Sequence, residues 1–300
     1  MPRVVRTTMN FALDPALGGV ETYTLGTADY YKRKFSPASV EVKNIRGSED
    51  DFSLNKQGFQ LVKHISSEKD FVDNDHIKKV VYPEVEELLK RTTGATKVQV
   101  FSHIVRRHTT DAIEQDIQKN NIADDAIYAE KVPPATFAHI DQGPDSALQI
   151  LNGILGEQAS KLKQSRWGII NTWKPLSPVK RDPLGVCDTR SVADDDLVSV
   201  FAVPKSTLGG STASTAVKSE GQKFQVLHLK ENPAQRWHYA SDMTPDEALL
   251  ITIFDTKEAE GQAGVHRRVP HSAFALKDSD DSPARESIEV RSLVFWDEPA

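Results

Sequence analysis

The chain has 300 residues, enough for one large domain with a sizeable buried core. Its hydrophobic fraction of 38% and charged fraction of 27% are those of an ordinary soluble globular protein, and a net charge of −6 with no basic stripe argues against a nucleic-acid partner. A single cysteine, Cys187, excludes an internal disulfide and a multi-cysteine metal site.

The same composition bears on localisation. One cysteine is typical of a protein from a reducing compartment. No stretch approaches the roughly 20 apolar residues that a membrane span requires. We therefore expect a cytoplasmic protein with no membrane and no nucleic-acid partner.

The N-terminal third of the sequence combines extended segments with one helix. Residues 1–60 are expected to form short extended pieces joined by turns. A helix is predicted after Asn74 and Asp75, which can cap its first turn, and Gly94 is expected to end it. Pro83 inside this pattern predicts a kink, or a junction between two shorter helices.

Strand-like segments dominate the rest of the chain. A second helix is predicted over about 144–164, where apolar residues recur at helical spacing. Residues 205–222 are rich in Ser, Thr, Gly and Lys and are expected to form an exposed, mobile loop. Strands are predicted at 97–106, 136–141, 167–173, 198–203, 224–230, 248–254 and 287–296.

This order of elements predicts a mainly β fold with flanking helices, because strands are many and no β–α–β alternation is present. A double-stranded β-helix, the cupin-like jelly-roll, suits the strand spacing, although spacing alone does not separate it from another antiparallel sandwich. No repeat or long linker divides the chain, so we predict a single domain over residues 1–300. About 1–95 would supply N-terminal strands and helical support, and about 96–300 the jelly-roll core.

The clearest chemical signal is the triplet His139-Ile140-Asp141. In an extended strand, residues i and i+2 share a face, so His139 and Asp141 would point the same way. His271, on a distant strand, could add a second imidazole. Two imidazoles and one carboxylate on one side of a metal form the facial triad of non-heme Fe(II) oxygenases. The alternative is a chance triplet on an edge strand and an unrelated histidine.

A second signal lies near the C-terminus, where Arg285 and Ser287 open the last apolar strand. An oxygenase that uses 2-oxoglutarate needs a cation for the distal carboxylate, and the guanidinium fork of arginine suits this role. Ser287 would share a face with Arg285 and could donate a further hydrogen bond. Arg291, farther along the same face, is the rival candidate. Either arginine could instead form a surface ion pair with Glu289.

Candidates for substrate contact are weaker. Asn171 and Trp173 alternate to one side of a strand and could line a pocket, or could be a turn residue and a core residue. His103 and Arg106 belong to a basic patch that could meet an anionic group or simply be solvated. Tyr239 could enter the cavity, although its segment is more typical of a packing strand. No nucleophile is predicted, because Cys187 has no activating partner in the sequence.

Several segments resemble the AsaB-type hydroxylase/desaturase family, which includes the fungal gibberellin desaturase and proteins related to a cephamycin 7-methoxylase subunit. The resemblance extends from about residue 40 to 296. Its segments are Asn44-Ile45-Arg46-Gly47, Gly58-Phe59-Gln60-Leu61-Val62, 82–90, Thr93-Gly94-Ala95, Val100-Phe101-Ser102-His103, 171–176, Asp182-Pro183-Leu184, Pro270-His271-Ser272-Ala273-Phe274 and 285–291.

The resemblance implies a jelly-roll oxygenase that depends on Fe(II), 2-oxoglutarate and O2 and serves secondary metabolism. It places the metal triad at His139, Asp141 and His271. Such enzymes hydroxylate, desaturate or close rings on small molecules, including terpenoids and amino acids, so the resemblance indicates the reaction type and not the substrate.

We therefore expect an Fe(II)/2-oxoglutarate oxygenase that acts on a small molecule. The alternatives are a cupin-like metal dioxygenase or isomerase without 2-oxoglutarate, and a jelly-roll binding protein without catalytic activity. The chain could also form a homodimer, although no particular residue predicts one.

Overall fold

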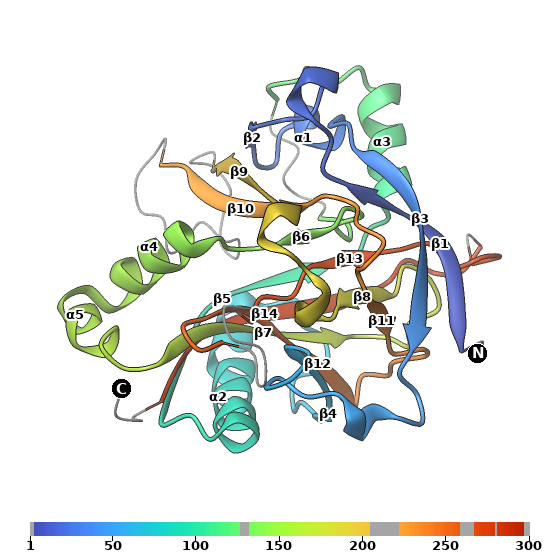
Figure 1. The fold of residues 1–300 in the computed structure, drawn as a ribbon. Coiled ribbons are helices and arrows are strands. Elements are labelled where there is room, and N and C mark those ends of the chain that lie inside the picture. The colour runs from blue at the N-terminus through green and yellow to red at the C-terminus, as the bar shows by residue number, and fades with distance from the viewer. Residues whose placement is uncertain (1–2, 127–131, 205–221, 259–266, 280, 297–300) are drawn as a thin grey trace.

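The computed structural model describes residues 3–126, 132–204, 222–258, 267–279 and 281–296, and within them the strands form two sheets (Figure 1). The larger sheet runs in the spatial order β1 (Val4–Phe11), β3 (Ser36–Asn44), β11 (Trp237–Tyr239), β8 (Leu184–Cys187), β13 (His271–Ala273), β6 (His139–Ile140), β10 (Phe224–Leu229), β9 (Leu197–Val203) and β2 (Thr22–Thr24). The smaller sheet has the order β4 (Phe59–Lys63), β12 (Glu247–Asp255), β7 (Trp167–Pro175), β14 (Ser287–Phe295) and β5 (Lys97–Arg106).

The strands alternate their side chains between a face that looks toward the other sheet and a face that looks outward. The resulting core joins Val186 of the larger sheet to Ile169, Leu249, Ile251 and Leu293 of the smaller one. Two curled sheets around a common interior confirm the predicted mainly β, jelly-roll fold. Four of the five strands of the smaller sheet come from predicted strand segments.

The helices lie around the two sheets (Figure 1). They are α1 (Ala28–Tyr31), α2 (Asn74–Thr93), α3 (Thr110–Lys119), α4 (Pro144–Leu155) and α5 (Ala159–Leu162). The predicted helix at 144–164 is therefore two helices with a 3-10 turn between them. Within the described residues, no helix combines the length and apolar character needed to cross a membrane.

Helix α2 packs against the outer face of the smaller sheet. Asp73 accepts hydrogen bonds from the first-turn amides of Asp75 and His76, and Gly94 ends the helix with a φ of 71°. The helix continues through Pro83 and is not split into the two shorter helices that the sequence allowed. Its apolar stripe forms one cluster with the outward residues of β14, which offsets the hydrogen bond that proline cannot donate.

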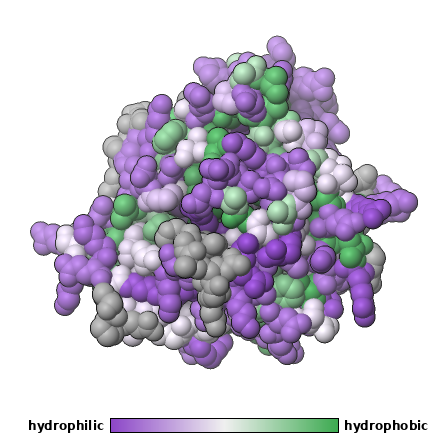
Figure 2. Space-filling view, in the orientation of Figure 1, coloured by the Kyte–Doolittle hydropathy of each residue, from purple (hydrophilic) through white to green (hydrophobic). Residues whose placement is uncertain are grey.

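The N-terminal residues form longer strands than expected. β1 and β3 pair along their whole length, and β3 continues the larger sheet by parallel pairing with β11. Helix α3 was not predicted; it packs Ile113 and Ile117 against Ala28 of α1. The predicted loop at 205–222 lies, apart from its last residue, outside the described residues. Figure 2 shows a mainly hydrophilic face on which hydrophobic residues form small, separate groups.

Candidate metal centre

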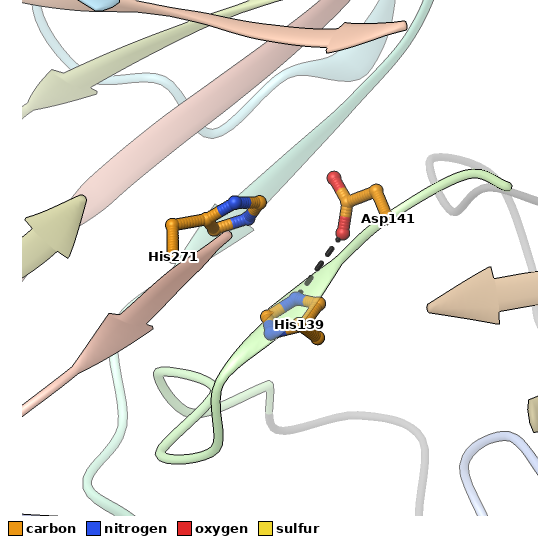
Figure 3. A group of neighbouring side chains, drawn as sticks. All are labelled: His139, Asp141 and His271. Carbon is orange, nitrogen blue, oxygen red and sulfur yellow. Dashed lines mark ion pairs between the residues drawn. The ribbon is translucent and has the colours of Figure 1, made fainter. Parts of the chain in front are cut away.

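The two candidate histidines are neighbours across a strand pair. β6 and β13 are antiparallel, and their register places His139 directly opposite His271. Cross-strand partners project from the same face of a sheet, and the two ring centroids are 4.6 Å apart. Asp141 follows two residues after His139, and its Oδ1 is 3.3 Å from His139 Nε2 (Figure 3). One ligand atom from each residue lies within 4.8 Å of the others.

Backbone carbonyls orient both imidazoles. His139 Nδ1 donates to the carbonyl of Phe137 over 2.8 Å, and His271 Nδ1 donates to that of Val269 over 3.0 Å. A carbonyl oxygen can only accept, so the proton sits on Nδ1 and the lone pair of Nε2 is left for a ligand bond. Burial, and then the neighbouring His139, lower the pKa of His271 to about 4, which favours the neutral imidazole that binds metals.

The carboxylate of Asp141 is held from the smaller sheet. Asn171 Nδ2 donates to Asp141 Oδ2 over 2.7 Å, and Arg291 Nε donates to the same oxygen over 3.3 Å. Burial alone would raise the pKa of Asp141, but Arg291 and the two histidines hold it well below its usual value. Asp141 is therefore an anion whose Oδ1 stays directed toward the two imidazoles.

This donor set fits a divalent iron. Two neutral nitrogens and one carboxylate oxygen on one side of a point leave the opposite positions open, as a facial triad requires. The histidines are buried, with exposed fractions of 7% for His139 and 3% for His271, so bulk water has little access. The hydrogen bonds to Nδ1 and to Asp141 Oδ2 are the outer contacts that keep metal ligands in position.

Arg285 and Ser287 form a second polar cluster beside the centre. Arg285 Nη1 donates to the Asp182 carbonyl over 2.7 Å, and its guanidinium lies 5.1 Å from the centre of the Trp173 ring. The buried Arg285 Nε and Ser287 Oγ have no hydrogen-bond partner among the described residues. Burial, and then the nearby Arg106, lower the pKa of Arg285 to about 9. A buried cation with unused donors fits a carboxylate ligand.

Arg291 has different surroundings. Besides Asp141, it forms an ion pair of 2.5 Å with Glu289, and both of these side chains are buried. The sequence allowed a surface ion pair between these residues. The ion pair forms, but it is buried. Because Arg291 already has two acidic partners, it is the poorer candidate for a further carboxylate.

A cavity opens from the candidate metal centre toward the N-terminal segment. His139, Asp141 and Arg291 form its floor. Its walls are mainly apolar and aromatic and include Tyr23, Leu25, Tyr30, Phe137, Phe224 and Val226. Such a cavity suits a small apolar molecule. Tyr23 and Tyr30 were not predicted to line it, because nothing in the sequence of the N-terminal segment ties it to a histidine more than a hundred residues away.

The chain is similar to known proteins in both sequence and fold. A family model described as an oxidoreductase/YMDC permease-like domain matches residues 12–295. The hydroxylase/desaturase efuI of Hormonema carpetanum is 40% identical over 98% of this chain and 96% of its own length. The alpha-ketoglutarate-dependent dioxygenase phiK of a fungal species is 35% identical over 89% of this chain and 87% of its own length. The chain belongs to this hydroxylase/desaturase family.

A solved structure of the iron and alpha-ketoglutarate-dependent endoperoxidase NvfI has the same fold, with a TM-score of 0.77. The two chains are 26% identical, and the match covers 98% of each. The predicted resemblance to the hydroxylase/desaturase family is thereby confirmed.

Of the five residues that the sequence suggested for substrate contact, three lie on the inner side of the smaller sheet in this protein and two do not reach the cavity. Arg106 lines the cavity. Asn171 lies on the same inner side but is hydrogen bonded to Asp141. Trp173 also faces inward, where it packs beneath Arg285.

His103 and Tyr239 do not reach the cavity. His103 pairs in register with Val290 on the outer face of the smaller sheet, where its ring nitrogens contact Tyr82 Oη at 2.9 Å and Asn74 Oδ1 at 3.0 Å. Tyr239 lies on the outer face of the larger sheet against Phe274, with ring centroids 5.3 Å apart. Both positions follow from strand alternation, because a shift of one residue moves a side chain to the opposite face.

Proposed function

We propose that this protein is a single-domain, non-heme iron oxygenase that uses 2-oxoglutarate and O2 to hydroxylate, desaturate or form a ring in a small molecule of secondary metabolism. His139, Asp141 and His271 would hold Fe(II). Arg285, with Ser287, would hold the distal carboxylate of 2-oxoglutarate. The observation that carries the proposal is the buried set of two imidazoles and a carboxylate, each fixed by a partner outside the set.

Iron with bound 2-oxoglutarate and O2 supplies the oxidising power that breaks an unactivated C–H bond. The protein residues provide position and environment. The Nδ1 hydrogen bonds keep both imidazoles in the ligand tautomer, and Asn171 and Arg291 keep Asp141 ionised and turned toward them. The apolar walls limit water and would hold a substrate beside the open side of the triad.

The proposal is tested by mixing the protein with Fe(II) and 2-oxoglutarate without oxygen. We expect the weak visible charge-transfer band of the chelated cosubstrate, and its loss in His139→Ala, Asp141→Ala and His271→Ala. His103→Ala is the matched control, because His103 is a buried histidine on the other face of the smaller sheet. It should keep the band.

Two other outcomes would contradict the proposal. A protein that binds iron but gives no band, and no succinate coupled to oxygen uptake, would be a metal dioxygenase or isomerase without 2-oxoglutarate. A protein that retains no metal after dialysis, and in which His271→Ala changes only stability, would be a binding protein.

A further inference from the structure

A second chamber adjoins the cavity at the metal centre. The two share Tyr30, Phe137 and Arg106 in their walls, so one molecule can extend from the first into the second. The second, which we call the outer chamber, adds Arg33 and has a volume of about 320 Å³. That volume is within the range of small-molecule sites.

Arg33 is held in an unusual way for a cation. Its guanidinium carbon lies 4.0 Å from the ring centre of Tyr30, 4.2 Å from that of Tyr23 and 4.7 Å from that of Phe137. Its Nε donates to the Tyr30 carbonyl over 2.8 Å. Nη1 is buried and has no hydrogen-bond partner among the described residues, and no carboxylate in that part of the chain forms an ion pair with Arg33. The rings fix the cation without neutralising it.

Arg106 supplies a second cation to the outer chamber. It lies on the inner face of β5, opposite Ser287, and its Nη1 donates to the Pro133 carbonyl over 2.6 Å. As with Arg33, no ion pair joins it to a carboxylate of the described residues. Glu114 also lines the chamber, and burial and then Asp111 raise its pKa.

We propose that the substrate is an apolar acid whose hydrophobic body fills the cavity at the metal centre and whose carboxylate is bound by Arg33 and Arg106 in the outer chamber. This inference rests on the proposed function, since it places the reacting carbon at the metal. Two arginines without an ion-pair partner among the described residues line the outer chamber, and a carboxylate is a group that can accept from both. A neutral substrate would leave the buried Nη1 of Arg33 unpaired.

The experiment uses 2-naphthoic acid and its methyl ester as probes, because they share an aromatic body and differ in charge. Binding is measured by fluorescence titration near neutral pH, first with the metal-free protein and then with Fe(II) and saturating 2-oxoglutarate under nitrogen. We expect the acid to bind at least about tenfold more tightly than the ester. Added salt should weaken binding of the acid and not of the ester.

Variants assign the effect to residues. Arg33→Gln and Arg106→Gln should each reduce the affinity for the acid about tenfold and leave the ester unchanged. Arg107→Gln is the matched control, because Arg107 is paired with Glu286 at 2.7 Å and does not line the chamber. Circular dichroism shows whether Arg33→Gln folds. If it does not, Arg33→Lys and Arg106→Gln test the inference instead. Arg33→Lys should keep the preference for the acid over the ester, and Arg106→Gln should lose it.

Three results would overturn the inference. These are equal affinity for acid and ester, an equal loss in Arg107→Gln, and displacement of the acid by 2-oxoglutarate, which would show that the arginines serve the cosubstrate. None of these readouts needs turnover. A preference for the acid without any 2-oxoglutarate oxidation would contradict the proposed function and leave only the carboxylate site at Arg33 and Arg106 standing. Oxidation of 2-oxoglutarate without a preference for the acid would contradict the carboxylate site and leave the proposed function standing.

Discussion

Neighbouring side chains orient the carboxylate of Asp141 so that Oδ1 lies toward His139. Both hydrogen bonds from the smaller sheet, from Asn171 and from Arg291, end on Oδ2. Oδ1 is left on the side of His139. Such outer contacts typically contribute about 10- to 100-fold to metal affinity. Arg291 is thus expected to act through Asp141, whereas Arg285 has unused donors of its own.

This difference predicts opposite effects of two arginine substitutions. Arg285→Ala should raise the KM for 2-oxoglutarate and change iron affinity little, because it removes a carboxylate partner. Arg291→Ala should weaken iron binding about 10- to 100-fold, because Asp141 loses its counterion. Iron titration and initial rates at varied 2-oxoglutarate measure the two effects. The reverse ranking would show that Arg291 holds the cosubstrate.

At the scale of the element, β7 has buried polar side chains on both of its faces. Asn171 and Trp173 look inward, while Lys174 looks outward and is buried, with 3% exposed. Its ammonium donates to the carbonyl of His64 over 2.5 Å and to that of Pro245. Burial lowers the pKa of Lys174 to about 8 from an ordinary value of 10.5, although Asp246 opposes the shift.

The lowered pKa predicts a pH-dependent stability. Between about 8 and 10.5 the unfolded chain keeps the Lys174 proton while the folded protein loses it. The unfolded state then binds more protons, so the free energy of unfolding should rise with pH through this window. Lys174→Met should remove this rise. Urea unfolding at several pH values measures it, and an identical slope in both proteins would contradict the assignment.

For the whole molecule, stability depends on the core between the sheets, which also carries the site. Leu293 lies on the inner face of β14, is fully buried, and is on the same strand as Ser287, Glu289 and Arg291. The strand that packs the core therefore also positions the polar residues beside the metal centre.

Leu293→Ala should lower the free energy of unfolding by about 2–5 kcal/mol, because it removes buried methyl groups and leaves a cavity. Leu17→Ala is the control, since Leu17 is 71% exposed, and it should change stability by less than about 0.5 kcal/mol. Denaturant unfolding measures both. A loss below about 1 kcal/mol for Leu293→Ala would show that this region repacks.

Most strands, the two longest helices and the types of the candidate ligands could be predicted from the sequence, whereas α3 could not. Period-two alternation is local, so the strands from 97 to 106 and from 287 to 296 could be read directly. The start of α2 was located to within two residues, although its cap is Asp73 and not Asn74 or Asp75. The spacing of His139 and Asp141 predicted a shared face, because strand geometry makes residues i and i+2 neighbours. The positions of Arg285 and Ser287 indicated a carboxylate site for the same local reason.

The contacts between residues distant in the sequence depend on how the strands pair. The register of β6 against β13 brought His271 opposite His139, and the pairing of β14 with β7 brought Arg291 beside Asn171 and Asp141. The tertiary structure also turned His103 and Tyr239 away from the cavity at the metal centre and placed Arg33 in the outer chamber beside it. Strand register depends on packing across the whole sheet, and a shift of one residue moves every side chain of a strand to the opposite face. Local sequence patterns therefore do not predict these contacts.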